Sequence, residues 1–314
     1  MTPDPAFRAD VLAGLAAPVP AVPARWLYDR RGSELFEAIT RLPEYYPTRT
    51  ETAMLERFSD DFADLSSAGA AVVEFGSGSS AKTPILLRAI RPAAYVPIDI
   101  SGDFLRESAR SLAAEFPGLP VHPVEADFTR PLTLPAEIAA LPKLGFFPGS
   151  TIGNFVARSA VDLLRAMKET LGEGSRLLIG LDRIKEVDIL LAAYDDPAGV
   201  TARFNLNLLD RINAELDGDI PVGAFRHRAI WNDAMSRIEM HLEALRDVAF
   251  TVAGEGFALK AGATIHTENS HKYGYRDSRL MLRAAGWGVV REWIDEREWF
   301  SIILAEAEPP RFAP

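Results

Sequence analysis

The stretch Ala71-Val-Val-Glu-Phe-Gly-Ser-Gly-Ser-Ser-Ala-Lys-Thr83 decides the fold of this chain. Its first five residues are mostly apolar and predict a buried strand, and a helical pattern follows over residues 83–90. Between them, Gly76 and Gly78 permit a tight turn and let the backbone approach a ligand closely. A helix that begins after such a turn offers free N–H groups and partial positive charge. The stretch therefore predicts a strand–turn–helix unit that binds a nucleotide-like ligand.

Short apolar runs alternate with amphipathic stretches beyond this unit. Further strands are predicted over residues 95–100, 121–126, 143–149 and 176–182, and further helices over 104–116, 159–171 and 277–285. Residues 287–293 and 299–305 predict a closing hairpin. Strands that alternate with helices imply a parallel sheet, and right-handed crossovers place helices on both of its faces. The predicted fold class is α/β, a doubly wound, Rossmann-like sheet.

The pattern changes in the middle of the chain. One long helix is predicted over residues 201–216. Polar and apolar residues alternate within residues 224–265, which predicts antiparallel strands with one solvent-exposed face. Two discontinuous domains are therefore predicted. The nucleotide-binding domain comprises residues 52–184 and 273–314, and the second, α+β domain comprises residues 1–51 and 185–272.

Near the N-terminus the sequence predicts little regular structure before residue 26. Residues 1–25 are rich in alanine and proline and are interpreted as a loosely held lead-in. Ser33 is expected to cap the next helix, whose apolar face includes Leu35 and Ile39.

Composition narrows the possible classes of function. Of the 314 residues, 34 are Lys or Arg and 44 are Asp or Glu, which gives a net charge of −10, and none is Cys. The acidic balance argues against a nucleic-acid-binding surface. The missing cysteines exclude disulfides, thiolate metal sites and cysteine nucleophiles, and no apolar run approaches the ~20 residues of a membrane span. We expect a cytoplasmic monomer that acts on a small molecule, without nucleic-acid or membrane partners.

Acidic residues stand at the ends of the second and third predicted strands. Asp99 follows Gly78 by 21 residues, where a carboxylate accepts from the hydroxyls of a ribose. Asp127 could accept from an adenine amino group while Phe128 packs on the ring. Each acid alone would equally be a surface carboxylate, a cap or an Asx turn, but together with the glycine turn they favour a nucleotide.

The identity of the nucleotide stays open between two classes. Gly76, Gly78 and Ala81 fit the dinucleotide fingerprint of a nicotinamide-dependent oxidoreductase. The closing hairpin, and Glu74 just before the first glycine, instead resemble Rossmann-like methyltransferases that use S-adenosylmethionine. The five histidines show neither an evident hydride-site base nor metal-ligand spacing, so no metal is predicted.

Several separated motifs resemble the histidine-specific Nα-methyltransferases of ergothioneine biosynthesis. They are Tyr28-Asp-Arg-Arg-Gly-Ser-Glu-Leu-Phe, Ile39-Thr-Arg-Leu-Pro-Glu-Tyr-Tyr-Pro-Thr-Arg-Thr-Glu, Glu74-Phe-Gly-Ser-Gly-Ser, Phe147-Pro-Gly-Ser-Thr-Ile-Gly-Asn-Phe, Ala193-Tyr-Asp-Asp-Pro-Ala-Gly-Val-Thr and Ile265-His-Thr-Glu-Asn-Ser-His-Lys-Tyr. The resemblance covers residues 26–305. It implies a class I methyltransferase fold with a substrate-binding second domain, and trimethylation of L-histidine to its betaine with S-adenosylmethionine.

The resemblance also implies roles for individual residues. Tyr28 corresponds to a tyrosine near the methyl-accepting amine and is the expected catalytic residue. The expected substrate contacts are Gly149 and Asn154 at the amine and carboxylate, Tyr194 at the carboxylate, Tyr45 in the pocket lining, Met240 beside the ring, and Glu268 and Ser270 at the imidazole nitrogens. The expected cofactor contacts are Glu74, Gly76, Gly78, Lys82, Asp99, Asp127 and Phe128.

The imidazole contacts also make physical sense. On a strand, Glu268 and Ser270 are two residues apart and face the same side, while Asn269 faces the other. A carboxylate accepts from one ring N–H, and a hydroxyl serves the opposite nitrogen as donor or acceptor. Without the resemblance, Glu268 would equally be a salt-bridged strand glutamate and Ser270 a turn hydroxyl.

Three alternatives to histidine methylation follow from the same residues. The fold could methylate another amino acid such as tryptophan, although an indole has one ring N–H and fits the Glu268–Ser270 pair less well. A nicotinamide-dependent oxidoreductase is the second, and a non-catalytic protein that binds the cofactor is the third.

Overall fold

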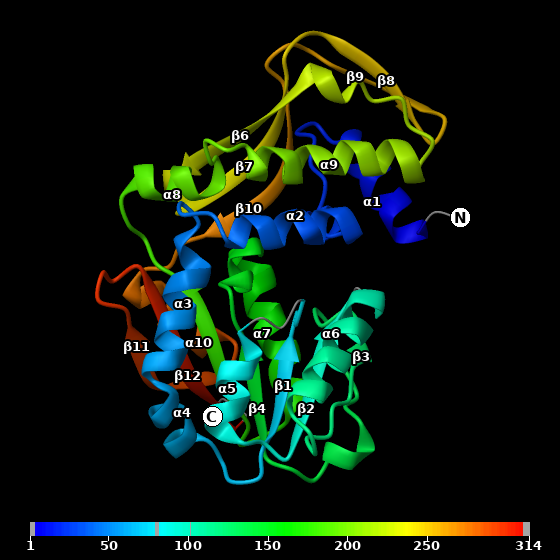
Figure 1. Cartoon of the computed structure of the whole chain (residues 1–314). Coiled ribbons are helices and arrows are strands. Elements are labelled where there is room, and N and C mark those ends of the chain that lie inside the picture. Colours follow the sequence, from blue (N-terminus) through cyan, green and yellow to red (C-terminus); the bar gives the residue numbers. More distant parts are fainter. Residues whose placement is uncertain (1–3, 79–81, 101, 310–314) are drawn as a thin grey trace, which may run out of the picture. The chain divides into compact units, whose positions relative to one another are not determined.

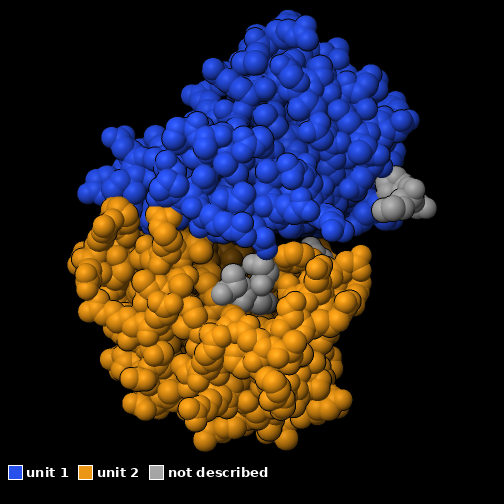
Figure 2. All heavy atoms as spheres, in the orientation of Figure 1, with its two compact units in different colours: residues 1–46, 185–271 blue, residues 47–184, 272–314 orange. Residues whose placement is uncertain are grey.

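The computed structural model describes residues 4–78, 82–100 and 102–309. Ala81, part of the dinucleotide fingerprint, lies outside these residues. The chain divides into two compact units (Figure 2). Unit 1 comprises residues 1–46 and 185–271, and unit 2 comprises residues 47–184 and 272–314. The units thus divide after Tyr46, Ile184 and His271. The domain boundaries predicted from the sequence were after residues 51, 184 and 272.

Unit 2 contains a seven-stranded sheet in the order β11-β12-β5-β4-β1-β2-β3. Its strands are β1 (Ala71–Phe75), β2 (Ala94–Asp99), β3 (Val124–Glu125), β4 (Lys143–Phe147), β5 (Arg176–Asp182), β11 (Trp287–Ile294) and β12 (Phe300–Ala307). Strands β1 to β5 pair in parallel, and β12 inserts antiparallel between β5 and β11. The predicted doubly wound sheet and its closing hairpin are confirmed, and this strand order is that of a Rossmann-like class I methyltransferase.

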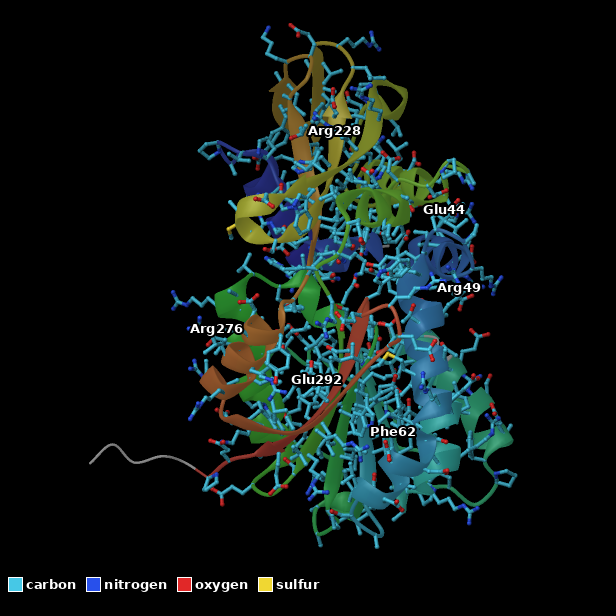
Figure 3. All side chains as sticks on the ribbon, turned by 90° about the vertical axis from the view of Figure 1, so that its left-hand side faces the viewer. Glu44, Arg49, Phe62, Arg228, Arg276 and Glu292 are labelled. Atoms are coloured by element: carbon cyan, nitrogen blue, oxygen red, sulfur yellow. The ribbon has the colours of Figure 1, made fainter. Side chains whose placement is uncertain are left out.

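Helices cover both faces of this sheet, as Figure 1 shows. On one face lie α7 (Ala157–Leu171) and α10 (Tyr275–Ala284), which share a core with alternate residues of the strands. On the other face lie α3 (Tyr46–Arg57), α4 (Ser59–Leu65), α5 (Thr83–Ile90) and α6 (Gly102–Glu115). Phe62 of α4 (labelled in Figure 3) packs edge-on against Trp293, with ring centroids 4.8 Å apart. Burial on both faces explains why the strands read as continuous apolar runs.

The third strand is shorter than predicted. Residues 121–126 were expected to pair throughout, but only Val124–Glu125 forms a strand and Val121 makes an isolated bridge to Tyr95. Pro120 and Pro123 flank Val121 and lack the N–H that a continuous ladder needs.

Unit 1 contains an antiparallel sheet, a separate β-hairpin and α-helices. The sheet has the order β10-β7-β6, from β6 (Phe225–Asn232), β7 (Arg237–Ala244) and β10 (Thr264–His271), and β8 (Val248–Val252) forms a hairpin with β9 (Glu255–Leu259). The helices are α1 (Pro5–Leu15), α2 (Arg30–Thr40), α8 (Val187–Tyr194) and α9 (Val200–Glu215). Helices α2 and α9 run side by side (Figure 1). The predicted α+β character is confirmed, and among the described residues no helix is long and apolar enough to cross a membrane.

Two expectations for the N-terminal region were wrong. Residues 5–15 form α1, which buries Phe7 and Val11 completely and is therefore anchored in a core. Asp4 caps this helix by accepting from the N–H of Phe7 and its neighbour, and Pro5 follows at the first helical position, a common start signal. The next helix is α2, capped by Asp29 rather than Ser33, because Asp29 accepts from the Gly32 N–H at 2.7 Å.

Candidate active site

The glycine turn, residues 76–78, follows β1 as predicted. Gly76 has φ +69° and Gly78 has φ +49°. Residues other than glycine adopt such positive φ values only at an energetic cost. A Cβ on Gly76 would lie 3.4 Å from the ring of Phe128, so the turn and that aromatic ring are in close contact. The Gly78 N–H donates to Asp99 Oδ2 at 2.9 Å. Asp99 thus holds the glycine turn through one oxygen, and a carboxylate has lone pairs to accept from a ligand as well.

Glu74 lies beneath the turn as a buried carboxyl group. Tyr95 and Thr83 donate to its Oε2 at 2.6 and 2.7 Å, which ties β1 to β2 and to the start of α5. Burial raises the pKa of Glu74 to about 7, against the opposing effect of these two hydrogen bonds. Glu74 therefore supports the loop from inside and titrates near neutral pH.

Asp127 and Phe128 follow β3. Asp127 Oδ1 accepts from the N–H and the hydroxyl of Thr129 at 3.0 and 2.6 Å, which is an Asx turn. The ring of Phe128 lies edge-on to Phe75 and Phe147, with centroids 6.4 and 6.0 Å away. The turn fixes the backbone around Asp127. Both of its hydrogen bonds use Oδ1, and neither uses Oδ2.

Lys82 and Gly149 meet at a carboxylate that the sequence analysis did not single out. Glu51 on α3 accepts from the Gly149 N–H through both oxygens, at 3.0 and 2.9 Å, and forms an ion pair with Lys82. Glu51 closes the motif that begins at Ile39, and that position was the available sequence signal. The three residues lie far apart in sequence, so only the fold brings them together.

The loop after β4 has an unusual backbone. Gly149 and Ser150 both have positive φ, +80° and +54°, and a short 3₁₀ turn (Thr151–Asn154) follows. Ser150 Oγ accepts from the Asp182 N–H at 2.9 Å, which fixes the loop to the end of β5. Asn154 ends this turn and is partly exposed.

In unit 1 the predicted substrate residues gather around β10. Glu268 pairs with Met240 and Ser270 with Ile238 across the β10–β7 ladder, so the side chains of these four residues share one face of the sheet. Both polar side chains are buried, with 8% of Glu268 and 4% of Ser270 exposed. The structure therefore confirms that Glu268 and Ser270 face the same side.

Tyrosine hydroxyls approach both polar groups. Tyr28 donates to Glu268 Oε2 at 3.5 Å, and Tyr194 shares a hydrogen bond of 2.6 Å with Ser270. Tyr45 lies edge-on to Tyr194, with ring centroids 6.0 Å apart. We call Glu268, Ser270, Tyr28 and Tyr194 the four-residue clamp.

The electrostatics of the clamp keep Tyr28 protonated. Burial, and next the negative charge of Glu268, raise the pKa of Tyr28 well above that of a free tyrosine. A phenol that keeps its proton acts as a hydrogen-bond donor, and the anionic form that a general base requires is disfavoured.

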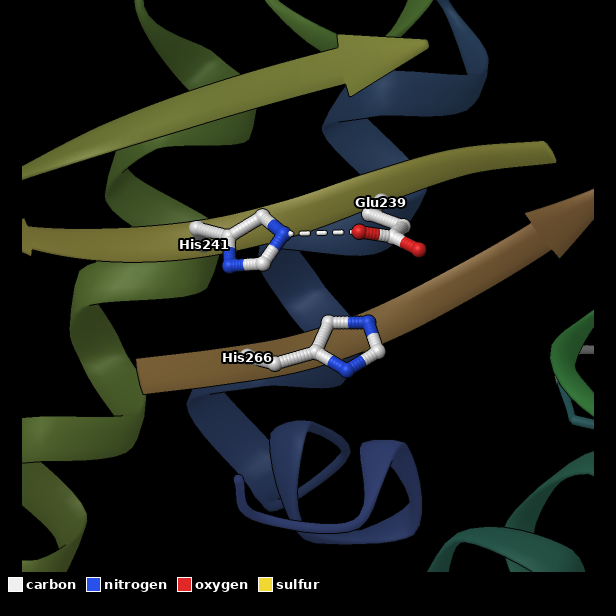
Figure 4. Close-up of side chains that lie close together, drawn as sticks. All are labelled: Glu239, His241 and His266. Atoms are coloured by element: carbon white, nitrogen blue, oxygen red, sulfur yellow. Dashed lines mark hydrogen bonds and ion pairs between the residues drawn. The ribbon is translucent and has the colours of Figure 1, made fainter. Parts of the chain in front are cut away.

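A second cluster lies on the opposite face of β7 and β10 (Figure 4). Glu239, His241 and His266 have candidate ligand atoms within 4.8 Å of one another. His241 donates to Glu239 at 3.1 Å, and the rings of His241 and His266 are stacked, 4.9 Å apart with 23° between their planes. The sequence analysis missed this back-face cluster, because the pairing of His241 with His266 arises from sheet register.

The geometry of the back-face cluster suits hydrogen bonding better than metal chelation. The lone pairs of two stacked rings lie in nearly parallel planes, so they do not converge on one cation as tetrahedral coordination requires. Although burial opposes it, hydrogen bonds from Arg237, Asn232 and His241 lower the pKa of Glu239 to about 2. That carboxylate is already committed to cationic and polar partners.

A β-bulge connects this cluster to the clamp. The β10 register shifts between His266 and Glu268, which turns His266 away from the face that carries Glu268. His266 Nε2 donates to the backbone carbonyl of Glu268 at 3.0 Å. The back-face cluster therefore holds the backbone from which the clamp carboxylate extends.

Sequence comparison assigns the chain to a known family. Residues 7–307 match the family model described as "Histidine-specific methyltransferase, SAM-dependent". The chain belongs to this family. It is 40% identical over 307 residues to a histidine N-alpha-methyltransferase of Mycolicibacterium smegmatis, covering 96% of this chain and 94% of that protein, and 40% identical over 310 residues to one of Mycobacterium tuberculosis, with the same coverage.

A fungal relative extends the comparison. The chain is 30% identical over 302 residues to ergothioneine biosynthesis protein 1 of Neurospora crassa, covering 91% of this chain and 33% of that protein. As a member of this methyltransferase family, the chain uses S-adenosylmethionine. The glycine turn with its positive φ values and the strand-end acid Asp99 suit that cofactor.

Proposed function

We propose that the chain transfers methyl groups from S-adenosylmethionine to the α-amino nitrogen of L-histidine, giving the trimethylated betaine as a step of ergothioneine biosynthesis. The names and the 40% identity of the two mycobacterial relatives support the reaction, and the name of the Neurospora relative supports the pathway. The family match favours methyl transfer over the hydride transfer of a nicotinamide-dependent oxidoreductase.

One observation carries the choice of histidine. Glu268 and Ser270 are buried polar groups on one face of β10, each joined to a tyrosine hydroxyl. A ring with two opposed nitrogens would satisfy both groups, because the carboxylate accepts from N–H and the hydroxyl serves the other nitrogen. An indole has one ring N–H, so one of these two groups would form no hydrogen bond to the substrate, a loss of about 0.5–1.5 kcal/mol.

The remaining assignments are part of the same proposal. Tyr45 and Met240 would line the ring, and Tyr194 would bind the substrate carboxylate. Gly149 and Asn154 would contact the amine and carboxylate. Glu74, Gly76, Gly78, Lys82, Asp99, Asp127 and Phe128 would hold or support the cofactor.

Methyl transfer from this cofactor does not require the protein to form a covalent bond with the substrate. S-adenosylmethionine supplies a methyl group that is already electrophilic on a sulfonium. The chain must hold the amine in line with that methyl group and keep it unprotonated, and burial next to positive charge lowers the pKa of an amine. We assign Tyr28 to orienting the amine as a neutral phenol, since its raised pKa disfavours the phenolate.

The proposed setting follows the sequence. We propose a monomer that acts in the cytoplasm on a small molecule, without nucleic acid or membrane as partner. The net charge of −10 supports the absence of a nucleic-acid surface.

The test is mass spectrometry of products formed from S-adenosylmethionine and an equimolar mixture of the common amino acids. We expect stepwise gain of up to three methyl groups on histidine alone. Methylation of another amino acid would overturn the roles of Glu268 and Ser270 while keeping the family assignment. Absence of any methylated product from folded protein would overturn the proposed function.

A further inference from the structure

Glu51 is a charged side chain in an almost fully buried position. It is 1% exposed and projects from α3 toward β5. A Cβ at Gly180 of β5 would lie 2.0 Å from Glu51 Oε1. No other residue type fits at position 180 without displacing this carboxylate, so the glycine makes the room that Glu51 occupies.

The partners of Glu51 offset the cost of burying its charge. Both carboxylate oxygens accept from the Gly149 N–H, and Lys82, whose side chain is 17% exposed, supplies the opposite charge. The Lys82 ammonium also lies 3.6 Å from the Cβ position of Gly149. A single carboxylate thus fixes both the loop after β4 and the lysine that precedes α5.

We propose that Glu51 is a positioning residue that also neutralises Lys82 at the carboxyl edge of the unit 2 sheet, where the cationic methyl donor binds. This inference rests on the proposed cofactor role of Lys82. By holding the ammonium and the Gly149 backbone in one arrangement, Glu51 orders this part of the edge and balances the charge of Lys82.

The neutralisation has a consequence that separates two ligands. S-adenosylmethionine carries a positive sulfonium, and S-adenosylhomocysteine has a neutral thioether in its place. Removing the charge of Glu51 takes the ion-pair partner from Lys82 in a partly buried site, so the ammonium repels the sulfonium more strongly and leaves the thioether unaffected. A purely structural role would weaken both ligands equally, because they share every other group.

The experiment measures Kd for both ligands by calorimetry, with thermal unfolding of each variant alongside. We expect Glu51→Gln to raise the ratio of the S-adenosylmethionine Kd to the S-adenosylhomocysteine Kd about fivefold or more. Adding Lys82→Met to that variant should return the ratio to the wild-type value. Lys82→Met alone should lower the ratio, whatever it does to both affinities in common.

The matched control is Glu296→Gln, because Glu296 forms an exposed ion pair with Arg57 of the same helix. This variant should leave the ratio unchanged. If Glu51→Gln fails to fold, the direction of the Lys82→Met shift decides the question. An unchanged ratio in Glu51→Gln, or in Lys82→Met where that variant decides, overturns the inference.

Failure of the proposed function would look different. If the wild-type protein bound neither ligand, the methyl-donor assignment would fail before the variants were compared. If it bound both but methylated another amino acid, the substrate assignment would fail and the ratio test of Glu51 would still apply.

Discussion

The proposed cofactor contacts of unit 2 all lie between residues 74 and 128, at or just after the ends of successive strands, whereas the proposed histidine contacts of unit 1 come from positions far apart in the sequence. The glycine turn offers N–H groups and positive-φ geometry within three residues. The four-residue clamp joins Tyr28 to Glu268 across 240 positions of sequence. The proposed nucleotide site is therefore local in the sequence, and the proposed imidazole site depends on tertiary structure.

The largest expected effect tests whether the clamp acts on histidine alone. Glu268→Ala should raise the histidine KM about a hundredfold, since a hydrogen bond to a charged group contributes about 1.5–3 kcal/mol. The S-adenosylmethionine Kd should stay unchanged. Asn269→Ala is the control, because its side chain faces the other side of β10 and should leave KM near wild type. Equal losses in histidine and cofactor binding would break the separation between the two regions.

A second prediction concerns a pH dependence that belongs to unit 2. Burial raises the pKa of Glu74 from 4.5 to about 7, so between these values the folded chain keeps a proton that the unfolded chain has released. Stability should therefore fall as pH rises from 5 to 8, by about 2 kcal/mol from this group.

Thermal unfolding between pH 5 and pH 8 measures this contribution. Glu74→Gln preserves an acceptor for Tyr95 and Thr83 but does not ionise, so its Tm should decline less with pH than that of the wild-type protein. Parallel curves for the two proteins would show that Glu74 ionises without penalty. The clamp should add no such slope through Tyr28, whose raised pKa keeps it neutral over this range.

A third prediction sharpens the contrast within unit 2. Asp99→Ala removes the acceptor for the Gly78 N–H and the proposed ribose contact. Both S-adenosylmethionine and S-adenosylhomocysteine should bind about tenfold more weakly, with their ratio unchanged because they share the ribose. Asp103→Ala, at an exposed pair with Arg106, is the control. A change in the ratio would mean that Asp99 senses the sulfonium.

The same contrast explains what the sequence could predict. The strands and helices of unit 2 follow from local apolar periodicity, and β5 and α5 begin and end where the pattern does. The cap of α2 was misassigned because Ser33 and Asp29 are both good capping residues, and the choice depends on where the chain enters the helix. The helix α1 was missed because alanine and proline masked the start signal at Asp4-Pro5.

The site residues also divide into those that local sequence spacing predicts and those that only the fold brings together. Glycines and acids at strand ends are recognisable from spacing, so the glycine turn and Asp99 were found from the residues themselves. The clamp could be named only through a family resemblance, since nothing local connects Tyr28 or Tyr194 to β10. Glu51 and the back-face cluster depend on contacts between α3, the β4 loop and the β10 register, which no periodicity encodes.

The smallest expected effect tests whether the two faces of β10 act together. His266 donates to the Glu268 carbonyl at 3.0 Å, and burial lowers the pKa of His266, which keeps it neutral. His266→Leu should remove this donor and raise the histidine KM about threefold, since a neutral hydrogen bond contributes about 0.5–1.5 kcal/mol. His266→Gln, which retains a donor, should recover part of the loss. The backbone bonds of His266 to Pro20 and Val22 do not involve its side chain, so a larger rise in cofactor Kd than in histidine KM would contradict this role.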